Sequence, residues 1–133
     1  MADTFTGVVN AGPEDSTYVG GEHGNVSIQE VQDLIEDSRI SNVELLVSEF
    51  PSETGNKVRD RLCFVHIDVD VYDSAKNIWE WCTTKLSSGS VVVFDDFGFS
   101  STDGITKFVN EIAGDEKYLF IHNLNGHAIM VKR

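Results

Sequence analysis

Short apolar runs separated by polar segments are the clearest feature of the hydrophobic pattern. Residues 62–67 and 91–94 are nearly continuous apolar stretches without the alternation of a half-exposed strand. Such runs are typical of parallel strands that are covered on both faces. Residues 43–47 form a further short apolar run, which predicts a third strand. Two closing strands are expected at residues 118–121 and 128–131, joined by a hairpin turn with the sequence Asn123-Leu124-Asn125-Gly126.

Three helices are predicted between these strands. The first begins at Ser27, where Ser27 and Glu30 form a capping box, and apolar residues then recur at helical spacing. The second is expected to be capped by Asp73 or Ser74 and to end near Gly89. The third runs from about residue 103 to residue 113. Helices that alternate with strands in this way predict an α/β fold with a mostly parallel sheet and a C-terminal antiparallel hairpin.

The N-terminal segment differs from the rest of the chain. Residues 1–26 are rich in Gly, Asp, Ser and Asn and contain no periodic apolar pattern. A loop of this length is unusual in a compact domain and is often a lid or a binding segment. We therefore expect residues 1–133 to form a single domain that carries a long N-terminal loop.

Charge and composition narrow the classes of partner. The formal net charge is −12, and such an acidic surface disfavours nucleic acid, whose binding depends on Lys and Arg. The longest apolar run is only one strand long, so no membrane span is predicted. The start of the chain lacks a basic and apolar leader pattern, and Cys63 and Cys82 are expected to be buried reduced thiols. These features favour a cytoplasmic protein.

Acidic residues follow both continuous apolar runs. Asp68 comes directly after the first run, and Asp95 and Asp96 come directly after the second. Ligands of open parallel sheets bind beyond the carboxyl ends of the strands, where these carboxylates would meet. Like charges at close range repel, and a hard divalent cation such as Mg²⁺ or Ca²⁺ would relieve this repulsion through oxygen ligands. The alternative is that Asp95 or Asp96 only caps the following turn or helix.

Other polar residues near these runs have less specific interpretations. Asp70 is predicted to point to the same face as Asp68, either as an additional ligand or to hold a neighbouring group. His66 lies inside an apolar run, where a histidine is usually a satisfied core residue. His23, in the N-terminal loop, could contact a substrate, whereas His122 and His127 near the hairpin are expected to be structural or exposed.

Several of these segments together resemble one enzyme family. The chain is similar to the macrocin-type, S-adenosylmethionine-dependent O-methyltransferases of antibiotic biosynthesis. The segments that carry this resemblance are Asp3-Thr4-Phe5-Thr6-Gly7, the stretch from Phe64 to Ser74 with its His-x-Asp-x-Asp-x-Tyr-x-Ser pattern, Ser88-Gly89-Ser90 followed by residues 91–98, and Gly104-Ile105. The match covers nearly the whole chain. It implies a Rossmann-like class I methyltransferase fold, of which this chain would be the C-terminal two-thirds.

The resemblance also implies roles for individual residues. Asp68, Asp95 and Asp96 would bind Mg²⁺, and Asp68 would in addition act as the base beside the acceptor hydroxyl. Asp3 would bind the ribose hydroxyls of S-adenosylmethionine. The implied activity is Mg²⁺-dependent methyl transfer to a hydroxyl group of a small molecule or sugar.

The chain also departs from the family pattern. Family members have a first strand and a glycine-rich turn before the position of Asp3, and only Met1 and Ala2 precede it here. We therefore expect an incomplete fold with impaired cofactor binding, and a homodimer that covers the exposed strand edges. The alternatives are a non-catalytic, cation-binding fragment of the fold and, from the Asp-x-Asp after a strand, a phosphatase of the haloacid-dehalogenase type.

Overall fold

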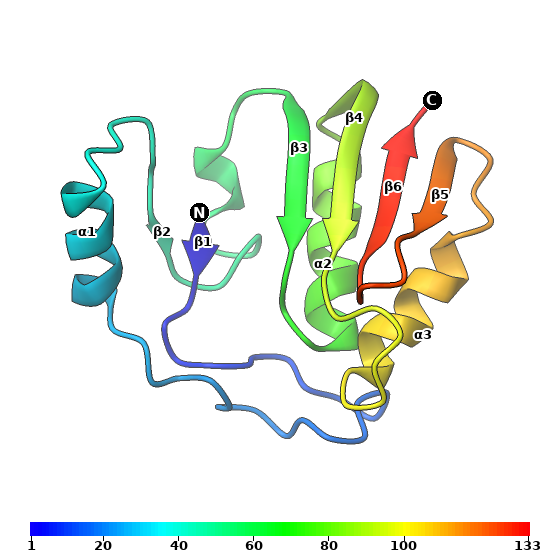
Figure 1. Ribbon diagram of the computed structural model, residues 1–133, viewed down its shortest axis with the longest axis horizontal. Coiled ribbons are helices and arrows are strands. Elements are labelled where there is room, and N and C mark those ends of the chain that lie inside the picture. Colours follow the sequence, from blue (N-terminus) through cyan, green and yellow to red (C-terminus); the bar gives the residue numbers. More distant parts are fainter.

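The computed structural model describes all residues from Met1 to Arg133. Strands and helices follow one another along the chain, with one short 3-10 turn between the second and third strands (Figure 1). The elements are β1 (Ala2–Asp3), α1 (Ile28–Asp37), β2 (Leu46–Val47), the 3-10 turn (Gly55–Lys57), β3 (Leu62–Ile67), α2 (Tyr72–Thr83), β4 (Leu86–Phe94), α3 (Asp103–Ile112), β5 (Tyr118–His122) and β6 (Ala128–Lys132).

The strands form two separate sheets. The larger sheet has the order β3-β4-β6-β5, with β3 and β4 parallel and β6 antiparallel to both of its neighbours. Strands β1 and β2 form a parallel pair of their own. In Figure 1 this pair lies beside the larger sheet, with β1 on the side of β3. The predicted α/β fold with a C-terminal antiparallel hairpin is therefore confirmed, and one edge of β3 has no strand partner.

Two helices cover one face of the larger sheet. Helices α2 and α3 pack against each other and against the same side of the strands (Figure 1). Along β4 and β6 the buried residues alternate with partly exposed ones, and Val92, Phe94 and Met130 are fully enclosed in the core. On the opposite face, Phe64 is 59% exposed. The prediction that residues 62–67 are covered on both faces is therefore wrong in this structure, because helix α1 lies beyond β2 and not over β3.

The boundary between α2 and β4 also differs from the prediction. The helix ends at Thr83, and β4 begins at Leu86 and continues through Gly89 to Phe94. The pairing register with β3 shifts between Leu62 and Phe64. At this irregularity the Ser90 hydroxyl donates to the Leu62 carbonyl and accepts from the Ser87 amide. A left-handed Gly89, with φ of 83°, allows the strand to pass through the turn-like sequence that predicted a helix end.

The N-terminal loop is tied to the starts of both core helices. Helix α2 begins after Val71, which cannot cap it, and not after Asp73 or Ser74 as predicted. Asp15 of the loop caps the helix instead. Its carboxylate accepts hydrogen bonds from the Tyr72 amide at 2.9 Å and from the Gly12 amide at 2.9 Å. The Asp103 carboxylate accepts from the Ser16 amide at 3.0 Å. The loop is therefore held across the carboxyl ends of the strands.

Two further observations bear on the composition. Cys82 is buried in α2, where burial raises the pKa of its thiol to about 12, whereas Cys63 is exposed, so the prediction of two buried thiols is wrong for Cys63. None of the helices combines the length and the apolar composition needed to cross a membrane.

Candidate metal and methyl-transfer site

Three carboxylates converge where β3 and β4 end. Asp68 and Asp70 follow β3, Asp96 follows β4, and one oxygen from each lies within 4.8 Å of the other two. Asp70 and Asp96 have left-handed backbones, with φ of 62° and 56°. Aspartate tolerates this conformation better than most residues. The turns after the two strands therefore direct their side chains into a common space.

The electrostatics of this acidic cluster, defined as Asp68, Asp70 and Asp96, are unfavourable without a counter-ion. Partial burial, followed by the charges of Asp95 and Asp96, raises the pKa of Asp68. Burial raises the pKa of Asp70 to about 6, and a hydrogen bond with Asp96 and the charge of Asp96 add to this effect. Asp68 and Asp70 are thus harder to ionise than ordinary aspartates. An oxygen-only donor set under this repulsion fits a hard divalent cation.

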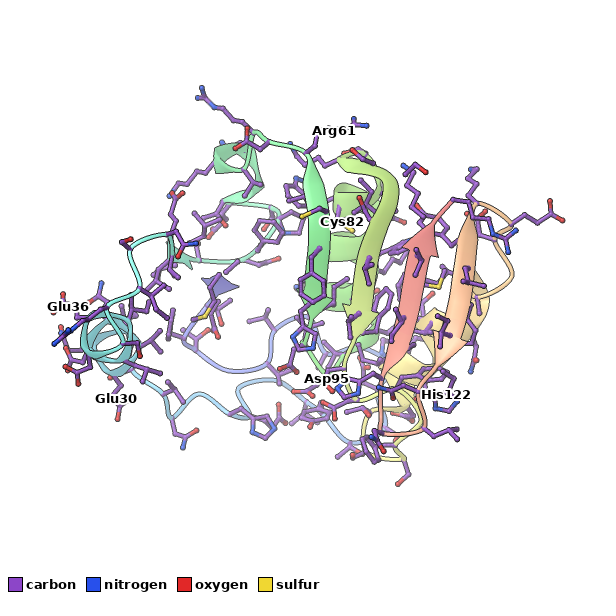
Figure 2. The ribbon with its side chains drawn as sticks, turned by 45° about the horizontal axis from the view of Figure 1, so that its top comes forward. Glu30, Glu36, Arg61, Cys82, Asp95 and His122 are labelled. Atoms are coloured by element: carbon purple, nitrogen blue, oxygen red, sulfur yellow. The ribbon has the colours of Figure 1, made fainter.

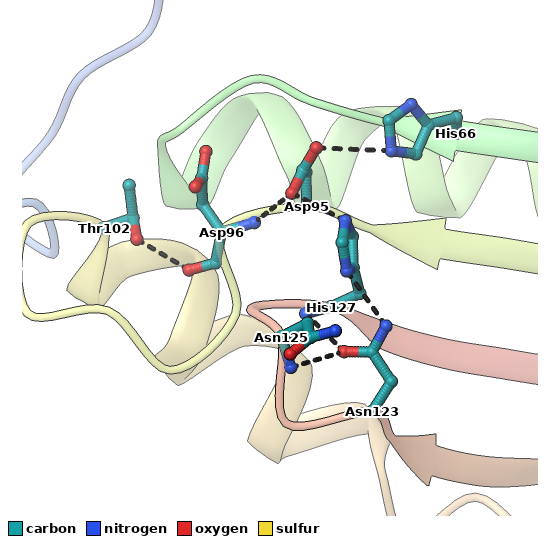
Figure 3. Close-up of polar contacts among 7 residues, drawn as sticks. All are labelled: His66, Asp95, Asp96, Thr102, Asn123, Asn125 and His127. Carbon is teal, nitrogen blue, oxygen red and sulfur yellow. Dashed lines mark hydrogen bonds and ion pairs between the residues drawn. The ribbon is translucent and has the colours of Figure 1, made fainter.

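Asp95 does not join the acidic cluster in this structure. Its carboxylate lies between two histidine rings, with Oδ2 at 3.4 Å from His66 Nε2 and Oδ1 at 3.2 Å from His127 Nε2 (Figure 3). Figure 2 shows Asp95 at the carboxyl end of β4, with Arg61 at the other end of the sheet. Of the three metal ligands that the sequence suggested, the structure brings Asp68 and Asp96 together and turns the Asp95 carboxylate toward the histidines.

The histidine contacts correct one interpretation made from the sequence and add detail to another. The His66 side chain is 44% exposed and is not a core residue, because it stands on the face of β3 that no helix covers. His127, which was expected to be structural or exposed, is partly buried and contacts Asp95. The strand pairing explains this contact. Phe94 at the end of β4 pairs with Ala128 at the start of β6, so Asp95 and His127, the next residues beyond this pair, become neighbours.

A groove of about 740 Å³ separates the β1–β2 pair from β3 and ends at the acidic cluster. Its lining is mostly apolar and also includes Asp3, His23, Asp68 and Asp70. Asp3 lies at the end of β1, where its Oδ1 accepts from the Phe5 amide at 2.7 Å. Asp3 and Asp68 are thus placed along one groove, as expected if one binds a cofactor and the other faces the acceptor.

The N-terminal loop also approaches the acidic cluster. The Tyr18 hydroxyl lies 3.4 Å from His23 Nε2, and the two rings are tilted against each other at 5.9 Å. Burial, followed by the charges of Asp70 and Asp96, raises the pKa of Tyr18. The loop therefore brings an aromatic hydroxyl and an imidazole to the side of the carboxylates.

The geometry after β3 counts against a haloacid-dehalogenase phosphatase. That fold needs a flap after its Asp-x-Asp motif. Here helix α2 begins at Tyr72, two residues after Asp70, which leaves no room for a flap.

Comparisons with known proteins identify the fold. No protein-family model matches the sequence, and a search of curated protein sequences gives no match. Among solved structures, the O-methyltransferase NovP superposes with a TM-score of 0.73 at 19% identity, over 98% of this chain and 58% of NovP. The calicheamicin methyltransferase CalS11 gives 0.72 at 21% identity, over 98% of this chain and 58% of its own. An O-methyltransferase from Bacillus cereus in complex with SAH gives 0.56 at 18% identity, over 80% of this chain and 60% of its own.

These similarities concern the fold. The chain spans less than two thirds of the length of each of these three structures. In this chain β3 and β4 are parallel and β6 is antiparallel to its neighbours. The chain therefore has the architecture of part of a Rossmann-like methyltransferase fold.

Proposed function

We propose that this chain belongs to a Mg²⁺-dependent, S-adenosylmethionine-dependent O-methyltransferase of the macrocin type, acting on a hydroxyl group of a small molecule or sugar. The observation that carries the proposal is the convergence of the Asp68, Asp70 and Asp96 carboxylates at the carboxyl ends of β3 and β4. The shared fold supports it, since NovP and CalS11 are methyltransferases and the Bacillus cereus enzyme was solved with SAH.

The proposed cation ligands are Asp68, Asp95 and Asp96. The donor chemistry of the acidic cluster fits Mg²⁺, because all of its groups are carboxylates that repel one another in partial burial. Asp95 belongs to this set by the family resemblance and lies close enough to raise the pKa of Asp68. A bound Mg²⁺ would supply Lewis acidity that lowers the pKa of an acceptor hydroxyl.

The protein residues have separate tasks in this proposal. Asp68 would accept the proton of the acceptor hydroxyl, and a bound S-adenosylmethionine would supply the methyl group, its methyl–sulfur bond breaking to leave S-adenosylhomocysteine. Asp3 binds the ribose hydroxyls through the carboxylate oxygen that does not accept from Phe5. The N-terminal loop, anchored by Asp15, limits the access of water to the groove.

Cofactor affinity is proposed to be weak for these 133 residues alone. Phosphate- and methionine-binding turns of Rossmann-like folds are glycine-rich and follow a central strand. Here β1 and β3 are not paired with each other, and an open groove lies between them. This observation favours the second candidate, a cation-binding part of the fold that does not catalyse methyl transfer by itself.

A methyl-transfer assay with labelled S-adenosylmethionine and a panel of sugar and catechol acceptors separates the candidates. The proposal predicts slow transfer that EDTA abolishes and that Asp68→Asn removes. Cation binding without methyl transfer, and without binding of S-adenosylhomocysteine, would favour the second candidate. Hydrolysis of p-nitrophenyl phosphate would contradict both.

A further inference from the structure

The side-chain amide of Asn123 has a fixed orientation at the end of β5. Its Oδ1 accepts from the Asn125 amide at 2.9 Å and from the His127 amide at 3.1 Å (Figure 3). Turning the amide over would place its NH₂ group against these two N–H donors. The oxygen is therefore assigned by its partners, and Nδ2 is the atom that lies 3.0 Å from His127 Nδ1.

This orientation decides which nitrogen of His127 carries the proton. The Asn123 NH₂ group can only donate, so His127 Nδ1 must accept and cannot bear a hydrogen. In a neutral imidazole the hydrogen then resides on Nε2. His127 Nε2, which then carries the hydrogen, lies 3.2 Å from Asp95 Oδ1.

The same reasoning excludes a transition-metal site at these residues. His66, Asp95 and His127 present ligand atoms within 4.8 Å of one another. A histidine ligand must offer a bare nitrogen to the metal. His127 Nε2 bears a hydrogen as long as Asn123 keeps its orientation. With this tautomer His127 does not offer Nε2 as a metal ligand, and the three residues are in polar contact without forming a ligand set.

The Asp95 carboxylate is thus contacted from several sides. The Asp96 amide donates to Oδ1 at 2.9 Å, His127 Nε2 lies 3.2 Å from the same oxygen, and His66 Nε2 lies 3.4 Å from Oδ2. The Asp95 carboxylate is partly buried. Outer contacts of this kind orient a ligating carboxylate and tune its affinity for a cation.

We infer that Asn123 and His127 are positioning residues: Asn123 holds His127 as its Nε2–H tautomer, and His127 in turn orients the carboxylate of Asp95, which lies next to the acidic cluster and is a proposed cation ligand. The second half of this inference rests on the proposed function. The first half concerns the chain alone and does not depend on any activity.

The tautomer is tested by long-range ¹H–¹⁵N NMR of the histidine rings at neutral pH. Wild-type His127 is expected to show a bare Nδ1 and a protonated Nε2. In Asn123→Asp, a carboxylate keeps the two backbone hydrogen bonds but replaces the donor with an acceptor, so Nδ1 is expected to become protonated. Asn125→Asp adds the same charge to the same turn and should leave the wild-type pattern unchanged. A protonated Nδ1 in the wild type, or an unchanged pattern in Asn123→Asp, would overturn the inference.

The positioning role is tested by calorimetric Mg²⁺ titration of the same proteins. His127→Leu removes the donor and is expected to weaken Mg²⁺ binding by about 10- to 100-fold. His127→Gln retains an N–H donor and is expected to recover most of the affinity. Equal affinity in His127→Leu and the wild type would overturn the positioning role. Absence of Mg²⁺ binding by the wild type would instead refute the proposed function, and the NMR result would then decide the tautomer on its own.

Discussion

Burial and neighbouring like charges raise the pKa values of Asp68 and Asp70 at the end of β3. The Asp70 carboxyl is partly buried beside Asp68 and Asp96, and its pKa rises to about 6. The folded state therefore retains this proton to a higher pH than the unfolded chain, whose aspartates have an ordinary pKa of 3.8. The contribution of Asp70 to the free energy of unfolding therefore falls as the pH rises from about 4 to about 6, and this loss is complete above that range.

Asp70→Asn is predicted to stabilise the protein at pH 7 in the absence of divalent cations. The full difference in pKa would correspond to about 3 kcal/mol, which solvent screening of a partly exposed group reduces to about 1 kcal/mol. Asparagine also tolerates the left-handed backbone at this position, where φ is 62°. Urea denaturation at pH 7 measures the change.

The exposed Asp60, whose side chain makes no hydrogen bond, provides the matched control. Asp60→Asn removes the same charge and should leave the free energy of unfolding nearly unchanged. The gain from Asp70→Asn should also shrink at pH 4, where the wild-type carboxyl is protonated. A destabilised Asp70→Asn protein at pH 7 would show that the three carboxylates do not repel one another in the folded state.

At the scale of elements, Asp15 is predicted to stabilise both the N-terminal loop and helix α2. Asp15→Ala leaves the Tyr72 and Gly12 amides without their acceptor. Loss of a helix cap costs about 0.5–2 kcal/mol. Gly104 supports the same contact, because a Cβ at that position would overlap the Asp15 carboxylate. Urea denaturation and limited proteolysis within residues 4–26 measure the two effects.

Asp60→Ala again serves as the control, since it removes an aspartate without a structural contact. Faster cleavage of the loop in Asp15→Ala than in Asp60→Ala is expected, together with reduced stability. Equal cleavage rates in both variants would mean that the loop is held by its other contacts, such as the Ser74 hydroxyl with the Val9 carbonyl.

Sequence pattern predicted the regular elements better than their ends. The capping box of Ser27 and Glu30 marks the start of α1 as expected, since it depends on local hydrogen bonds alone. The start of α2 was missed because its cap comes from Asp15, 57 positions earlier in the chain. Such a contact is set by the tertiary fold and leaves no local signal.

The candidate site was predictable to a similar degree. The acidic residues that follow two apolar runs correctly predicted that Asp68 and Asp96 lie together at one edge of the sheet. The orientation of Asp95 could not be foreseen, because it depends on His127 in the turn after β5 and on the register between β4 and β6. Side-chain direction after a strand end is decided by such neighbours and not by spacing.

At the scale of the whole molecule, apolar surface and an unpaired strand edge remain exposed. One edge of β3 lacks a strand partner, and Phe64, Leu119 and Ile121 are exposed on β3 and β5. Exposed edges and apolar faces favour association. We predict a concentration-dependent homodimer in sedimentation equilibrium, weakened by Phe64→Lys. A protein that remains monomeric at all accessible concentrations would contradict this expectation.

The central claim is that the acidic cluster at the ends of β3 and β4 binds a divalent cation. Isothermal titration calorimetry with Mg²⁺ tests it most directly, using the wild type, Asp68→Asn and the control Asp60→Asn at pH 7. The account predicts one saturable site in the wild type and in Asp60→Asn, and loss of that site in Asp68→Asn. Absence of binding in the wild type, or equal binding in Asp68→Asn, would contradict it.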